Sequence, residues 1–83
     1  MAEITHMSLV ERIARVLAGE ALSSNAQGSD PSAGDKVDRT WREHVAEATA
    51  VLHAMREPDA AAAAAGDAAT WQRMIEASIA NAE

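Results

Sequence analysis

The sequence predicts an all-α domain, a small bundle of three main helices at about residues 8–20, 39–56 and 67–82, with a short alanine-rich helix at about 58–65. In each main segment, large apolar residues recur at the three- and four-residue steps that place them on one helix face. Residues typical of helix ends (Ser, Asp, Pro and Gly) stand at the borders of these segments. No segment alternates apolar and polar residues in the way that indicates a strand. We therefore expect residues 1–83 to form a single helical domain.

The first helix is predicted to begin at a capping box. Ser8 and Glu11 have the spacing at which the serine hydroxyl accepts a bond from the Glu11 backbone N–H while the carboxylate reaches back. Gly19 weakens the last turn, so we expect the helix to end near residue 20. Its apolar stripe is expected to combine Leu9, Val10, Ile13, Val16 and Leu17.

Residues 23–37 are expected to form a flexible loop. From Ser23 to Lys36 the chain contains no large apolar side chain, and Gly and Pro interrupt it. Loops of this length in a small domain are usually either functional or simply flexible, and this composition favours flexibility.

The second helix is predicted to start at a capping box formed by Thr40 and Glu43, with Asp38 as the alternative cap. Pro58 lacks a backbone donor and disfavours helical angles at Glu57, so the helix must break before it. The inward face between these limits is expected to contain Trp41, Val45, Ala48, Leu52 and Met55.

Pro58 is also suited to the first position of the short alanine-rich helix, and Gly66 is expected to end that helix. Asp67 is the expected N-cap of the last helix. The inward face of the last helix is expected to contain Trp71, Met74, Ile75, Ser78 and Ile79. The second and last helices are predicted to pack roughly antiparallel, with the first helix closing over them.

Composition excludes several classes of function. Thirteen acidic residues against seven basic ones give a net charge of −6, which opposes phosphate backbones, so no nucleic acid is expected as a partner. The chain has no cysteine, so disulfides and thiolate metal sites are excluded, which fits a reducing cytoplasm. No apolar run approaches the roughly 20 residues that span a bilayer, so no membrane association is expected. We expect a cytoplasmic protein.

Reaction chemistry is not evident in the sequence. His44 with Glu47, and His53 with Glu57, could each share a helix face, but a metal site needs three or four converging ligands, and solvated histidines are the simpler interpretation. The serines are explained by helix caps and loops, and none stands in the Asp-Ser-Leu context of an acyl carrier. We predict no catalytic residue, no cofactor and no metal, and therefore no enzyme.

Three residues at the predicted start of the second helix are candidates for contact with a partner: Arg39, Trp41 and Arg42. Cations are unfavourable at a helix N-terminus, so the arginines are either solvated and offset by nearby acids or bind an anionic group of a partner. The two tryptophans, Trp41 and Trp71, are expected in the core of the monomer, with an interface between subunits as the alternative.

The chain resembles a family of short, uncharacterised bacterial and phage-borne helical proteins. The matching parts are residues 13–17, Trp41, the Ala-Met-Arg-Glu-Pro segment at 54–58, and Trp71 followed by Met74 and Ile75. After the proline, such proteins often have Thr-Glu-Ala-Met, whereas this chain has Asp-Ala-Ala-Ala. The resemblance implies a shared fold and no activity.

The expected function is that of a non-enzymatic helical protein-interaction module, acting as a homodimer or as a small accessory subunit. The reason is that about half of the hydrophobic residues are alanine, so the core is thin and the margin of stability small. The alternative is an acidic regulator or inhibitor of a nucleic-acid-processing protein, which would require the carboxylates to gather on one face.

Overall fold

The computed structural model describes residues 7–82 except 27–32, and the side chains of residues 23–33 are not described. The elements are α1 (Leu9–Ala26), α2 (Ala33–Thr40), the 3₁₀ helix η1 (Trp41–His44), α3 (Val45–Ala54), α4 (Ala60–Ala65) and α5 (Ala68–Ala80). The described residues contain no strand, which confirms the all-α prediction.

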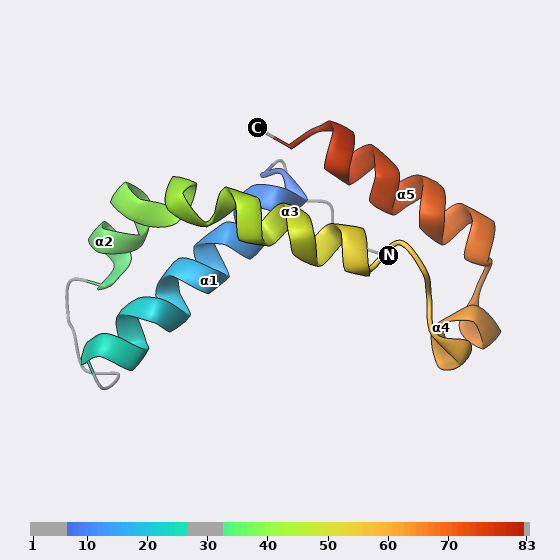
Figure 1. The fold of residues 1–83 in the computed structure, drawn as a ribbon, viewed down its shortest axis with the longest axis horizontal. Coiled ribbons are helices and arrows are strands. Elements are labelled where there is room, and N and C mark those ends of the chain that lie inside the picture. Colours follow the sequence, from blue (N-terminus) through green and yellow to red (C-terminus); the bar gives the residue numbers. More distant parts are fainter. Residues whose placement is uncertain (1–6, 27–32, 83) are drawn as a thin grey trace.

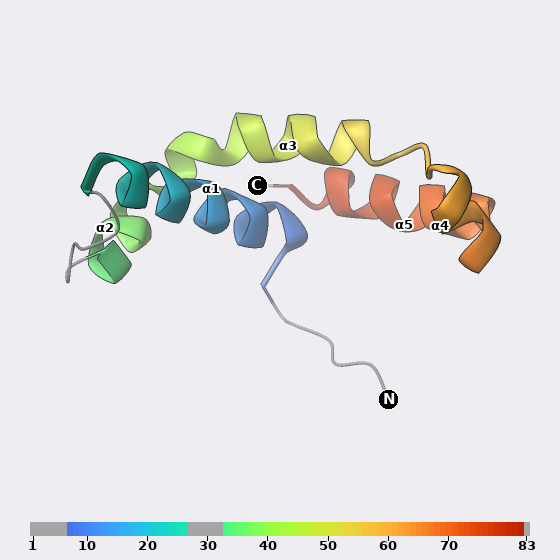
Figure 2. The same cartoon turned by 90° about the horizontal axis from the view of Figure 1, so that it is seen from below.

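The α2–η1–α3 segment forms a bent rod to which the other long helices attach (Figure 1). Figure 2 shows α1 and α5 on the same side of α3, with α1 towards one end of the rod and α5 towards the other. Helices α3 and α5 run in opposite directions, as predicted (Figure 1). The molecule is consequently elongated, with principal extents of 41 × 28 × 25 Å.

The core lies mainly where α1 crosses η1 and α3. Its buried residues are Val10, Ala14, Ala18, Trp41, Ala48, Leu52 and Ile75. Three of the seven are alanines, whose small side chains allow two helix backbones to approach closely. Because few large side chains are fully buried, the hydrophobic contribution to stability is small.

Both predicted boundaries of the flexible loop at 23–37 are wrong. Helix α1 continues through Gly19 to Ala26 instead of ending near residue 20, and α2 begins at Ala33. The remaining part of the expected loop, 27–32, lies outside the described residues. Tertiary packing stabilises α2 where local propensity predicted a loop, because Val37 packs against the core and Asp38 binds Arg15 of α1.

The predicted start of the second helix near residue 39 is also wrong. Thr40 makes no capping bond, and its hydroxyl instead donates to the Lys36 carbonyl oxygen at 2.7 Å, inside a helix that is already established. Bonds of this kind from threonine to the preceding turn often bend helices. The backbone tightens into η1 directly after Thr40 before continuing as α3.

Three other helix borders follow the sequence more closely. The Ser8 hydroxyl accepts from the Glu11 backbone N–H at 3.0 Å, and the Asp67 carboxylate accepts from the Ala69 N–H at 3.0 Å, so both capping residues are confirmed. The second half of the predicted capping box is wrong, because the Glu11 carboxylate binds Arg15 Nε at 2.8 Å instead of reaching back to Ser8. Helix α3 ends at Ala54, before Pro58 as predicted. Pro58, however, is not the first residue of α4 as predicted. The helix begins at Ala60 and is capped by Asp59, whose carboxylate accepts from the Ala62 N–H at 2.8 Å.

Candidate interaction surfaces

Trp41 belongs to the core and is only 6% exposed. The Arg42 guanidinium carbon lies 4.4 Å from the centroid of the indole ring, and that of Arg15 lies at 5.3 Å. Both distances are within the range of a cation–π interaction. Trp41 therefore joins α1 to the rod at η1 and presents little surface to a partner.

Arg15 connects three elements through its charge. Its Nε donates to Glu11 at 2.8 Å and its Nη1 donates to Asp38 at 2.6 Å, so it links α1 to α2 while lying over Trp41. The hydrogen bond to Asp38, followed by that to Glu11, raises the pKa of Arg15. This cluster explains why the chain around Arg39 is folded against α1.

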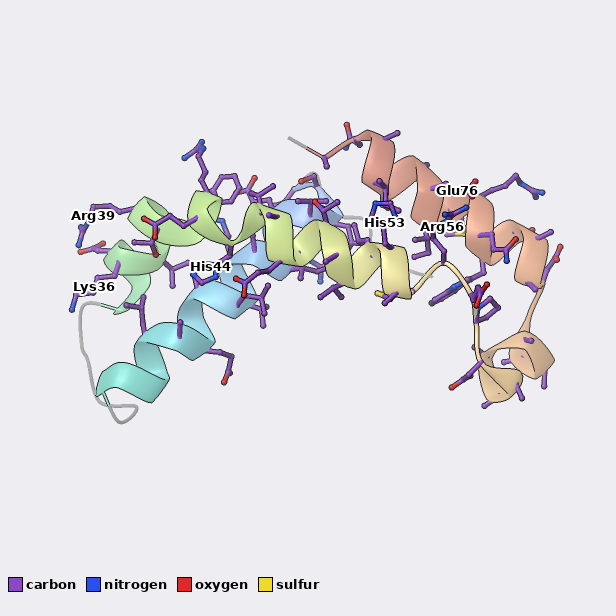
Figure 3. All side chains as sticks on the ribbon, viewed as in Figure 1. Lys36, Arg39, His44, His53, Arg56 and Glu76 are labelled. Carbon is purple, nitrogen blue, oxygen red and sulfur yellow. The ribbon has the colours of Figure 1, made fainter. Side chains whose placement is uncertain are left out.

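The two candidate arginines are exposed but do not lie at a helix N-terminus. Arg39 is in the last turn of α2 and points away from the body of the molecule beside Lys36 (Figure 3). Arg42 lies over Trp41 in η1. Because helical structure begins at Ala33, the first N–H groups that an anion would need are not at these arginines. The geometric basis for an anion site at residues 39–42 is therefore wrong.

Trp71 holds α5 at the C-terminal end of α3. Its indole Nε1 donates to the Met55 carbonyl oxygen at 2.6 Å, where the C-terminal carbonyl groups of α3 lack helical partners. Arg56 adds an ion pair with Glu76 of α5 at 2.8 Å, and Figure 3 shows these two side chains meeting. The Ala-Met-Arg-Glu-Pro segment thus holds α5 against α3.

The two histidines that the structure describes, His44 and His53, do not converge on a common site. His44 Nδ1 lies 2.7 Å from a Glu47 carboxylate oxygen, and His53 lies further along α3 near α5 (Figure 3). Among the described residues, no group of three or more His, Cys, Asp or Glu side chains could hold a metal ion.

An apolar surface groove lies between α1 and α3. Ile13, Val16 and Leu17 line it from α1, and Val51 lines it from α3. Val16 is 63% exposed and Val51 is 40% exposed, so two branched apolar side chains are exposed beside one groove. The sequence reasoning placed Val16 on the inward stripe and therefore missed this groove.

A signal for the groove was present in the sequence. The buried side of α1 is set by Val10, Ala14 and Ala18, which recur every four residues. Val16 lies about 160° around the helix from their centre, at 100° per residue. Weighting the pattern by large side chains alone hid the role of the alanines.

A second exposed apolar residue lies on α5. Met74 was expected on the inward face, but it is 64% exposed. It borders a shallow hollow that also involves Pro58, Ala62 and Trp71. This patch is smaller than the α1–α3 groove and has a single large exposed side chain.

The chain matches no protein-family model, no curated protein and no solved structure. The resemblance to short bacterial and phage-borne helical proteins therefore stays a prediction. In the part of the chain that the structure describes, no helix has both the length and the apolar character needed to cross a bilayer.

Proposed function

We propose that the protein is a non-enzymatic helical protein-interaction module, acting as a homodimer or as a small accessory subunit. The observation that carries this proposal is the exposed apolar groove between α1 and α3, with Val16 63% exposed at its edge. Burying this groove against another helix would add apolar contact to a molecule whose own core is thin.

Charge and composition bear on the partner and the compartment of this module. The net charge of −6 argues against nucleic acid as the partner, and the lack of cysteine fits the cytoplasm. The carboxylates of Glu11 and Asp38 are engaged with Arg15, and that of Glu76 is engaged with Arg56. These pairs give no reason to prefer the acidic regulator, which needs carboxylates directed together towards a partner.

Site-specific photocrosslinking in the native cell tests the proposal. A benzophenone amino acid at position 16 is expected to capture a protein partner or a second copy of the chain. The same amino acid in place of Ala77, an exposed residue of α5, is the matched control and should capture much less. Equal capture at both positions, or none at position 16, would contradict a role for the groove.

A further inference from the structure

We propose that the outer face of α1 pairs with the same face of a second copy, with the two helices antiparallel and Val16 at the two-fold axis. This inference rests on the proposed function, because it names the partner of the same surface. We define the outer face of α1 by five residues: Leu9, Arg12, Ile13, Val16 and Glu20.

The face has an apolar centre with opposite charges at equal distances on either side. Arg12 precedes Val16 by four residues and Glu20 follows it by four, so the three side chains lie along one line of the helix surface. Leu9 and Ile13 lie beside this line and are partly buried. Arg12 and Glu20 are both exposed.

This arrangement is complementary to itself in one orientation only. In an antiparallel pair centred on Val16, Arg12 of each copy lies opposite Glu20 of the other, which gives two ion pairs around the two-fold axis. In a parallel pair, Arg12 would face Arg12 and Glu20 would face Glu20, which is repulsive. The charges therefore select the antiparallel, closed dimer.

Neither charged side chain has a partner among the residues that the structure describes. The side chains of Arg12 and Glu20 make no ion pair or hydrogen bond there, whereas the neighbouring Glu11 and Arg15 pair with each other at 2.8 Å. Pairing with a second copy would thus break no bond of the folded chain. The incoming helix would also meet Val51 of α3, which is 40% exposed beside the same groove.

Sedimentation equilibrium of the purified full chain at low salt tests the pairing. The native chain is expected to have twice the monomer mass of 8.7 kDa. Glu20→Arg makes both intersubunit contacts repulsive and should weaken the dimer by about tenfold or more, as should Arg12→Glu. The double variant R12E/E20R restores opposite charges and should recover most of the affinity.

Arg73→Glu reverses an exposed charge on α5 and is the matched control, which should dimerise like the native chain. Far-UV circular dichroism of each variant checks that the helices remain folded. A native chain that stays monomeric at millimolar concentration overturns the inference. So does a dimer that the single reversals leave unchanged, or one that the double variant fails to restore.

Failure of this inference is distinguishable from failure of the proposed function. A monomeric chain whose position 16 still crosslinks to a different protein overturns self-pairing and leaves the interaction module standing. A monomeric chain without any crosslink at position 16 contradicts both.

Discussion

At the scale of single residues, burial depends more on where a residue lies around its helix than on how large its side chain is. Ala14 and Ala48 are 0% exposed, whereas Val16 and Met74 are 63% and 64% exposed. The alanines allow the helices to approach closely, so that a few large side chains fill the remaining space. Leu52 is the largest side chain that is fully buried, and the packing around it should be the most sensitive to truncation.

Leu52→Ala is expected to lower the free energy of unfolding by about 2–5 kcal/mol, because it removes buried apolar contact and leaves a cavity. In a protein with so thin a core, this loss should leave much of the chain unfolded at 25 °C. Urea denaturation followed by circular dichroism measures the effect. Val51→Ala, at the neighbouring but 40% exposed position, is the control and should lose much less.

Trp71→Phe tests the bond between α5 and the end of α3. The substitution keeps an aromatic ring but removes the donor to the Met55 carbonyl oxygen, now 2.6 Å away. We expect a loss of about 1 kcal/mol in the free energy of unfolding. Thermal unfolding checks this, and a variant as stable as the native chain would show that the bond contributes nothing.

At the scale of elements, the sequence predicted helices well where a capping side chain or a proline acts locally. Ser8 and Asp67 cap helices where they were expected, and α3 ends before Pro58 as expected. Local reasoning failed where packing between distant segments decides. Helix α2 depends on the contacts that Val37 and Asp38 make with the core and with α1. The residues next to them in the sequence do not predict those contacts.

The exposed groove was missed for a related reason. Its existence depends on which side of α1 faces the rod, and the small side chains of Ala14 and Ala18 decide that. The anion site considered as an alternative at Arg39 and Arg42 loses its geometric basis, because helical structure begins at Ala33. Contact of these residues with a partner stays a prediction.

Gly19→Ala tests the continuation of α1 beyond its expected end. A β-carbon at Gly19 would lie 3.9 Å from Val37 Cγ2, an ordinary contact, so alanine should gain about 0.5–1 kcal/mol from its better helix propensity. Chemical denaturation measures the gain. Gly66→Ala, outside any helix, should bring no comparable gain. A destabilised Gly19 variant would contradict a continuous α1.

The cap of α5 should make stability depend on pH. Hydrogen bonds from the Thr70 hydroxyl and from the backbone N–H groups of Ala69 and Thr70 hold the pKa of Asp67 below its ordinary value of 3.8. A lowered pKa in the folded state gives stability that is present above the unfolded pKa and is lost as pH falls through the folded pKa. Asp67→Asn should therefore flatten the acid side of the curve of melting temperature against pH.

Asp67→Ala removes the capping acceptor as well as the charge, so it should also lower the melting temperature near neutral pH. Asp67→Asn retains an acceptor and should lose less there. Identical curves for the native chain and both variants would contradict a capping role for this carboxylate.

At the scale of the whole molecule, one rod carries both α1 and α5, which also contact each other and share one core. Helix α1 packs on the rod around Trp41 and Leu52, and α5 is held through Trp71, Ile75 and the Arg56–Glu76 pair. Helix α1 lies at one side of this rod (Figures 1 and 2). Within the part of the chain that the structure describes, Arg12, Val16 and Glu20 of its outer face stay exposed. Folding of α1 onto the rod and association through its outer face should therefore be linked.

A dilution series followed by amide chemical shifts in ¹H–¹⁵N NMR spectra tests this central claim most directly. Between about 1 mM and 10 μM, shifts should change along the outer face of α1 and at Val51, with the rest of the chain nearly constant. Spectra that do not change with concentration, or changes centred on Met74 of α5, would contradict association through α1.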